Sequence, residues 1–197
     1  MIIGYEITGY DNDSCMTGSC EKLFDLPFIP KCSKCGYRTD YRYTNKDFKL
    51  KRKTLDFSST HDGVTIVSLK FKEFCNRYGY DGLEFVELPK TPNFFQFYIK
   101  DNIIKYEASF KEKICHNCGQ YESVIGPSMR LENVLEPLAD GFYQSDLWFA
   151  SGNEKSPVLI ISPITKEKLA REGFKNICLT KIEKENSHSK SVFQISS

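Results

Sequence analysis

Two short motifs in this chain place pairs of thiols at the spacing that metal sites use. One is the run 32–36 (CSKCG) and the other is the run 115–119 (CHNCG). Each run supplies two cysteine sulfurs separated by two residues, and together the runs make a four-sulfur set that suits tetrahedral zinc. The predicted metal ligands are Cys32, Cys35, Cys115 and Cys118.

A glycine follows the second cysteine of each motif, at Gly36 and Gly119. This position fits a turn with positive φ, in which backbone N–H groups point toward sulfur. Four protein sulfurs leave no open coordination position for water, so the predicted zinc is structural and not catalytic. Such a zinc contributes roughly 10–16 kcal/mol of apparent binding free energy, enough to decide whether a domain folds.

A redox or disulfide role is the alternative for the same cysteines. A thioredoxin-like dithiol needs one Cys-x-x-Cys pair at the N-terminus of a helix. Here both motifs are followed by polar and aromatic stretches of strand-like composition, residues 37–43 and 120–125. Structural zinc is therefore the favoured interpretation, with redox, disulfide and inert cysteines left open.

The four remaining cysteines do not form a second complete site. Cys15 and Cys20 make a Cys-x-x-x-x-Cys pair, whereas Cys75 and Cys178 fall at positions predicted to be in the core. No second pair completes a metal site with Cys15 and Cys20. We expect these two to be loop thiols, with metal or disulfide involvement as the alternative.

The bulk composition excludes several classes of protein. The chain has 197 residues and a net charge of +1, so no global field attracts it to nucleic acid or membrane. No apolar stretch approaches the roughly 20 residues of a membrane span, and the N-terminus lacks the basic region of a signal peptide. Eight cysteines without an export signal indicate reduced thiols and metal ligands, so the predicted location is the cytoplasm.

Two segments repeat one pattern without gaps. Residues 68–88 and 162–182 each read as a serine N-cap, a short helix, a stopping glycine, an aromatic residue and a strand. Each repeat follows one of the two cysteine motifs along the chain. An internal duplication is one interpretation, and a chance match of two common helix–strand units is the other.

The remaining segments favour strands. We expect a first strand over Met1–Thr8, a hairpin of residues 93–99 and 102–108, and buried segments at 147–150 and 157–161. Residues 53–63 read as a polar loop. The predicted fold is α+β, mainly antiparallel strands with two short helices, in which two zinc-ribbon-like CxxCG knuckles form one tetracysteine zinc site. It comprises one domain, 1–182, or two halves, 1–108 and 109–182, with a mobile polar tail at 183–197.

Catalytic constellations are missing from the sequence. The three histidines lie in a polar loop (His61), inside a cysteine motif (His116) and in the tail (His188). No nucleophile elbow, phosphate-binding glycine loop or His-Glu-x-x-His motif occurs. The acidic run 11–13 (DND) lacks the other ligand positions of a calcium loop and is predicted to be a turn. We therefore predict a protein that is not an enzyme and has no small-molecule substrate.

A basic run supports an alternative function. Residues 46–53 (KDFKLKRK) come soon after Tyr37, Tyr41 and Tyr43. Basic residues interleaved with aromatic residues on a zinc ribbon can hold single-stranded nucleic acid. One short run on a near-neutral chain is more often a solvated face, so nucleic-acid binding or regulation is the second reading.

The two CxxCG motifs, the 68–88 segment and the run from 145–150 through 162–182 together resemble the double-CXXCG motif family of small bacterial proteins. The resemblance covers roughly residues 30–182. It implies zinc at Cys32, Cys35, Cys115 and Cys118, and a cytoplasmic immunity protein that binds and neutralises a cognate toxin. The resemblance implies no particular toxin-binding residues. We therefore expect a non-enzymatic immunity protein whose partner is a toxin.

Overall fold

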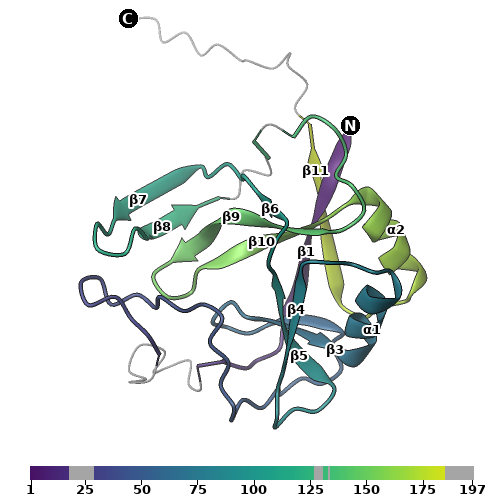
Figure 1. Ribbon diagram of the computed structural model, residues 1–197, viewed down its shortest axis with the longest axis horizontal. Helices are drawn as coiled ribbons and strands as arrows, with labels where there is room; N and C mark the ends of the chain where they lie inside the picture. The colour runs from purple at the N-terminus through teal and green to yellow at the C-terminus, as the bar shows by residue number, and fades with distance from the viewer. Residues whose placement is uncertain (18–28, 127–130, 133, 185–197) are drawn as a thin grey trace, which may run out of the picture.

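The structure is a computed structural model that describes residues 1–17, 29–126, 131–132 and 134–184. These residues form eleven strands and two helices, with the helices together at one side of the molecule (Figure 1). In chain order the elements are β1 (Ile2–Asp11), β2 (Phe57–Ser59), β3 (Thr65–Ser68), α1 (Leu69–Arg77), β4 (Leu83–Glu87), β5 (Phe94–Ile99), β6 (Ile103–Ile104), β7 (Phe110–Ile114), β8 (Tyr121–Ile125), β9 (Phe142–Ser151), β10 (Ser156–Ile161), α2 (Pro163–Arg171) and β11 (Ile177–Glu183).

The strands form one open mixed sheet with the order β4-β5-β3-β2-β1-β10-β9-β8-β7. Two further strands join it, β11 beside β1 and β6 beside β9. The β1–β2 and β6–β9 pairs are parallel, and every other strand pair in the described residues is antiparallel. The predicted arrangement of mainly antiparallel strands with two short helices is confirmed.

Strand β1 is the centre of this sheet. Tyr5 is paired with Ile161 of β10 and with Lys181 of β11, so strands from near the C-terminus lie on both edges of the first strand. The strand predicted at the N-terminus is confirmed, and it continues to Asp11. Because β1 lies between β10 and β11, the segments 1–108 and 109–182 are interleaved in the sheet.

Local capping signals set both ends of α1. The Ser68 side chain accepts a hydrogen bond from the Phe71 N–H, which satisfies a free donor of the first turn. Gly79 has φ of +65°, and the Tyr80 N–H donates to the carbonyl of Cys75 at 3.1 Å. The Tyr80–Cys75 bond and the positive φ of Gly79 form a Schellman ending, in agreement with the stopping glycine predicted from the sequence.

Helix α2 begins in the same way. Its cap, Ser162, accepts a hydrogen bond from the Thr165 N–H, and Pro163 occupies the first helical position. Gly173 follows the helix with φ of +60°. Phe174 then packs edge-on against Phe74 of α1, with ring centroids 5.3 Å apart.

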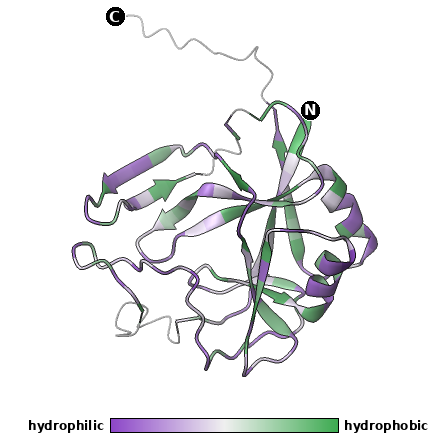
Figure 2. Ribbon diagram, viewed as in Figure 1, coloured by the Kyte–Doolittle hydropathy of each residue, from purple (hydrophilic) through white to green (hydrophobic). Residues whose placement is uncertain are grey.

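Both helices cover the same face of the sheet and share one hydrophobic core. Phe71, Phe74 and Leu169 from the helices pack with Ile7 and Ile161 from the central strands. The outward faces of the helices are hydrophilic, whereas the strands beneath them are largely hydrophobic (Figure 2). A second cluster around Tyr106, Phe149 and Ile160 includes residues of β9 and β10, and a third lies around Phe48 and Val64. Neither of these two clusters includes a residue of α1 or α2, so the helices pack on the first cluster.

The two helices occupy equivalent places in the strand order. Helix α1 connects β3 to β4, and β5 lies between these strands and is antiparallel to both. Helix α2 connects β10 to β11, and β1 lies between them in the same way. The middle strand is the next one along the chain in the first unit and the first strand of the chain in the second.

Three expectations about local structure are wrong. The predicted hairpin does not form, because β5 pairs with β3 and β4, whereas β6 crosses to pair in parallel with β9. The predicted polar loop 53–63 contains β2, whose Phe57 is only 1% exposed. Cys178, predicted to be in the core, is exposed on β11, an edge strand that pairs with β1 alone.

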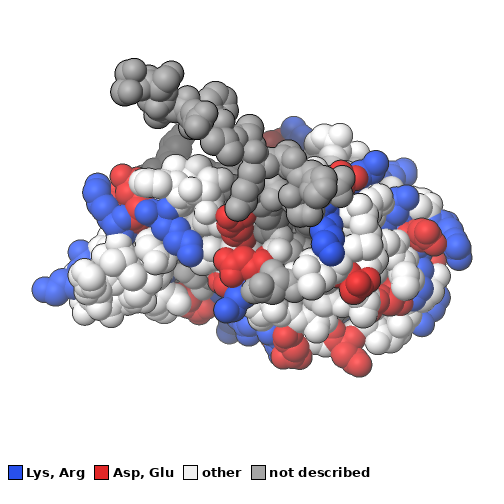
Figure 3. All heavy atoms as spheres, turned by 90° about the horizontal axis from the view of Figure 1, so that it is seen from above, with Lys and Arg blue, Asp and Glu red and all other residues white. Residues whose placement is uncertain are grey.

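The charged residues do not gather by sign on the face seen in Figure 3, where lysine and arginine are interspersed with aspartate and glutamate. In the described residues, no helix has the length and apolar character needed to cross a membrane. Of the predicted tail, Glu183 ends β11 and Lys184 is described, and 185–197 lie outside the described residues.

Candidate metal centre

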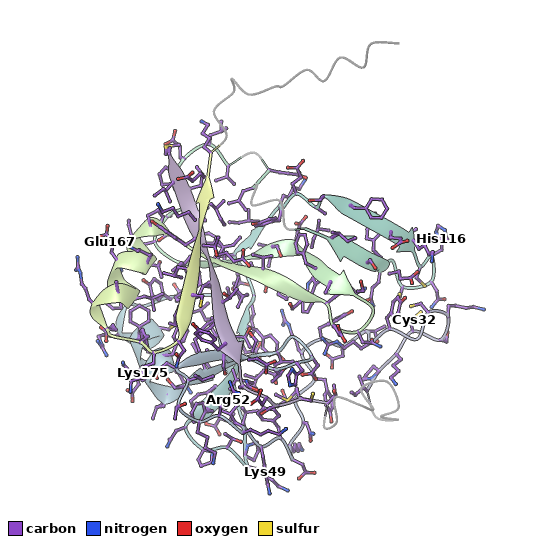
Figure 4. All side chains as sticks on the ribbon, turned by 180° about the vertical axis from the view of Figure 1, so that it is seen from behind. Cys32, Lys49, Arg52, His116, Glu167 and Lys175 are labelled. Carbon is purple, nitrogen blue, oxygen red and sulfur yellow. The ribbon has the colours of Figure 1, made fainter. Side chains whose placement is uncertain are left out.

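The four predicted ligand sulfurs come together at the side of the molecule away from the helices. In Figure 4, Cys32 and His116 mark this side, and Glu167 of α2 lies at the opposite side. The sulfurs of Cys32, Cys35, Cys115 and Cys118 all lie within 4.8 Å of one another. The structure therefore joins the two motifs into one cluster, as predicted from their spacing.

The spacing of the sulfurs matches a tetrahedral metal site. The Cys32 and Cys115 sulfurs are 3.9 Å apart, and those of Cys35 and Cys118 are 3.7 Å apart. Around an ion with metal–sulfur bonds of about 2.3 Å, four sulfurs at tetrahedral positions are separated by roughly 3.8 Å. The described cysteines in this cluster are free thiols, and the four together could bind one metal ion.

The two motifs adopt the same local turn. In the first, the Gly36 N–H donates to the Cys32 carbonyl at 2.9 Å. In the second, the Gly119 N–H donates to the Cys115 carbonyl at 2.7 Å. Gly36 and Gly119 have φ of +74° and +72°, a region in which a side chain is strained. The glycine predicted at each motif therefore has a backbone function.

Backbone N–H groups favour the thiolate form of the first cysteine in each motif. Hydrogen bonds from the Cys35 and Lys34 amides lower the pKa of Cys32, and the Asn117 side chain adds a third at 3.2 Å. The amides of Cys118 and Asn117 likewise lower the pKa of Cys115. Thiolates are the form that binds metal, so in each motif the turn favours metal binding by the first cysteine.

A buried lysine lies beside the cluster. Lys155 is 3% exposed, and its ammonium group donates to the Tyr121 carbonyl and to the side-chain oxygen of Gln120. Burial lowers the pKa of Lys155, and the sulfurs of Cys35 and Cys118 act in the opposite direction. Four thiolates around a divalent ion carry a net charge of about −2. Lys155 therefore supplies a positive charge that offsets part of this negative charge.

Hydrogen bonds outside the sulfurs hold the two motifs in register. The Tyr41 hydroxyl donates to the side-chain oxygen of Gln120 at 2.8 Å, and the Gln120 amide donates to the Arg38 carbonyl at 3.0 Å. The backbone N–H of Arg38 donates in turn to Asn153 in the β9–β10 connection. The segment after the first motif is thus bound both to the second motif and to the sheet.

The other cysteines and the histidine of the second motif take no part in this cluster. Cys15 is disulfide-bonded, so the expectation of a free loop thiol at this position is wrong. Cys20 lies outside the described residues. Cys75 is a buried residue of α1, as predicted, and His116 is exposed. His188 lies outside the described residues.

Sequence reasoning considered the acidic run 11–13 by itself and did not predict that His61 lies beside it. The side chains of Asp11, Asp13 and His61 converge, and His61 lies 2.6 Å from the Asp11 carboxylate. The Arg52 guanidinium, however, lies 2.6 Å from the Asp13 carboxylate. This group is therefore a surface network of paired charges. The pairing of β1 with β2 brings its members together, so no local signal could have revealed it.

The basic run is anchored by its apolar residues, and its lysines and arginine are exposed. Phe48 and Leu50 of the run are each 3% exposed and anchor it to the third core cluster. Tyr41 packs against Trp148, with ring centroids 4.5 Å apart. In Figure 4, Lys49 lies well away from Cys32.

No model of a known protein family matches this sequence, and no curated protein matches it either.

Proposed function

We propose that the four-cysteine cluster binds zinc and that this zinc is structural. The supporting observation is the approach of four sulfurs from two distant segments to the distances of a tetrahedral site. Zinc accepts four thiolates in this geometry, and with four protein ligands it has no position left for water or substrate. In the proposed site each CxxCG turn acts as one knuckle of a zinc-ribbon-like clamp.

We further propose that the protein is a non-enzymatic, cytoplasmic bacterial immunity protein that binds and neutralises a cognate toxin. The proposal is supported by the resemblance of the two CxxCG motifs and the two helix–strand segments to the double-CXXCG motif family. An immunity protein needs a rigid scaffold with a complementary surface and no catalytic groups. A zinc clamp between distant segments supplies such rigidity.

The hairpin of β7 and β8 is where we would look first for the toxin-binding surface. Phe110, Ile114 and Ile125 on this hairpin are exposed by 54%, 44% and 54%, and the second knuckle forms its turn. Apolar side chains grouped on a surface are often covered by a protein partner. Phe142, an aromatic residue at the start of β9, is buried at 1% exposure and is not available to a partner.

Native mass spectrometry tests the zinc proposal. Protein purified without added metal should carry one zinc per chain, and a strong chelator should remove the zinc and unfold the protein. Folded, metal-free protein with reactive thiols would instead support the redox alternative.

A growth assay tests the toxin proposal separately. Cells that express the toxin domain encoded beside this chain should survive only when the chain is co-expressed. Phe110→Asp and Ile125→Asp should reduce survival, whereas Glu87→Asp on the distant strand β4 should not. Survival that is independent of this chain, with a 1:1 zinc content intact, would contradict the toxin proposal and leave the zinc proposal standing.

We also propose that the units β3-α1-β4 and β10-α2-β11 arose by duplication. The proposal is supported by the equivalent capping residues, Ser68 and Ser162, and by the antiparallel strand between the outer strands of each unit. Related sequences that retain the same helix pattern in both units would support it, and relatives with unrelated sequences in one unit would count against it.

A further inference from the structure

A small cavity lies beneath the segment that follows the first knuckle. Its volume is about 40 Å³. By this measure a water molecule needs roughly 10–15 Å³, so the cavity has space for about three water-sized groups. Its walls include the guanidinium groups of Arg38 and Arg42, the Tyr98 phenol and the apolar side chains of Phe97 and Trp148. Arg42 is exposed, so the cavity reaches the surface beside it.

Two hydrogen-bond donors in this cavity have no partner among the described residues. They are the Nε of Arg38 and the hydroxyl of Tyr98, and both atoms are buried. Arg38 as a whole is only 5% exposed. Buried polar groups in folded proteins are almost always hydrogen-bonded, because leaving one unpaired forfeits its hydration. Both residues line the same cavity, so one acceptor bound there could pair with both donors.

The residues that line the cavity carry positive charge, although the Arg42 guanidinium lies 3.9 Å from the Glu84 carboxylate. None of the described residues that line it is aspartate or glutamate, whereas two are arginines. Arg38 donates from its NH2 group to the backbone carbonyls of Asp62 and Lys155, which are neutral acceptors. The nearby Asp62 carboxylate accepts hydrogen bonds from the backbone N–H groups of Met16 and Thr17. It is therefore directed away from the free donor of Arg38.

We propose that this cavity binds a small monocarboxylate. The two oxygens of a carboxylate can accept one hydrogen bond each from Arg38 Nε and the Tyr98 hydroxyl, and its charge balances the buried guanidinium. The apolar wall suits a hydrogen or a methyl group on the carboxylate carbon. The volume limits the ligand to about the size of formate or acetate. This site is independent of the zinc cluster and of the proposed toxin binding.

Thermal unfolding in formate tests the proposal. Sodium formate should raise the melting temperature in a saturable manner, with a dissociation constant on the order of 1 mM, since a three-atom ligand offers few contacts. Sodium chloride at equal ionic strength and formamide, the neutral analogue of formate, should not reproduce the shift. A shift that is equal in chloride or formamide would overturn the proposal, because water would then suffice in the cavity.

Tyr98→Phe provides a matched variant. It removes one proposed donor without changing the shape of the cavity, so formate should bind about tenfold more weakly. Without formate the variant should be at least as stable as the parent, because it removes a buried hydroxyl that has no partner. The control, Tyr10→Phe, alters an exposed tyrosine outside the cavity and should leave formate binding unchanged. Equal formate affinity in Tyr98→Phe and the parent would refute the proposal.

A direct measurement avoids variants altogether. In a ¹H–¹⁵N NMR spectrum of the parent protein, the Nε–H signal of Arg38 should shift progressively with formate and stay unchanged with chloride. An Arg38 signal that does not respond to formate would refute the proposed contact.

Discussion

The sulfurs of Cys32 and Cys115 lie 3.9 Å apart although 83 positions separate the two residues in the chain. Closing a loop of this length costs roughly 4 kcal/mol of chain entropy. A structural zinc contributes roughly 10–16 kcal/mol, which exceeds that cost by a wide margin. Metal binding can therefore hold the first knuckle against the β7–β8 hairpin with free energy left over for the rest of the fold.

The first prediction concerns the ligands themselves. Cys115→Ser should abolish stoichiometric metal binding and lower the melting temperature to that of the chelated parent, because three thiolates hold the ion far less tightly than four. The measurements are metal content by mass spectrometry and unfolding by circular dichroism. Cys178→Ser, which changes an exposed cysteine outside the cluster, is the control and should alter neither. Full metal content in Cys115→Ser would show that the metal is not bound by the four-cysteine cluster.

The second prediction concerns the buried lysine. Lys155→Met keeps the length of the side chain but removes the positive charge beside Cys35 and Cys118. Metal affinity should fall by about 10–100-fold, the usual effect of losing a group that supports the ligands. Competition with a chromophoric chelator measures this affinity. Lys34→Met, at an exposed position within the first knuckle, should have little effect. Equal losses in both variants would rule out a specific role for Lys155.

The third prediction contrasts two kinds of glycine. Gly119→Ala places a side chain at φ of +72° but in open space, so it should cost about 1–2 kcal/mol of unfolding free energy from backbone strain alone. Gly9→Ala would bring its Cβ to 2.4 Å from the Phe57 carbonyl oxygen, where β1 and β2 pair, and should cost about 3 kcal/mol or more. Denaturant unfolding of metal-loaded protein measures both. A smaller loss for Gly9→Ala than for Gly119→Ala would contradict this ranking.

The fourth prediction concerns pH and Glu6 of β1. One carboxylate oxygen of Glu6 is buried without a partner in the described residues, and burial raises the pKa of this group above its ordinary value of 4.5. The folded state therefore holds the proton more tightly than the unfolded state. The stability that the protonated Glu6 carboxyl contributes is complete below pH 4.5. It is lost as the pH rises through the pKa of this group in the folded state.

Glu6→Gln removes this titration and should stabilise the protein at pH 7 relative to the parent. The advantage should shrink as the pH falls toward 4, when the parent carboxyl is also neutral. Urea unfolding at several pH values measures it, with Glu87→Gln at an exposed position as the control. A difference between Glu6→Gln and the parent that does not change with pH would show that Glu6 keeps its ordinary pKa in the fold.

Features encoded by neighbouring residues could be predicted from the sequence. The caps Ser68 and Ser162 and the glycines that end the helices act within a few residues, so their pattern alone revealed both helices. The CxxCG turns are equally local, and each one supplies only two of the four sulfurs that a tetrahedral metal site requires. That requirement predicted the meeting of the two knuckles without any knowledge of the path between them.

Features that depend on distant pairing could not be predicted. The predicted hairpin of residues 93–99 and 102–108 was wrong because β5 pairs with β4, whereas β6 pairs with the distant strand β9. Cys178 is exposed because it lies between Ile177 and Leu179, which pack against the first core cluster, and therefore points to the opposite face of β11. The cavity at Arg38 and the charge network at His61 are assembled from several distant segments. No local pattern marks either one.

The central place of β1 has a consequence for the synthesis of this protein. Its partners β10 and β11 leave the ribosome only after residue 155, so β1 must wait through the synthesis of all the intervening strands before both of its edges are covered. Both knuckles are complete once residue 119 has emerged. An ion captured then would bring residues 32–119 together while the nascent chain still lacks the strands that close its core.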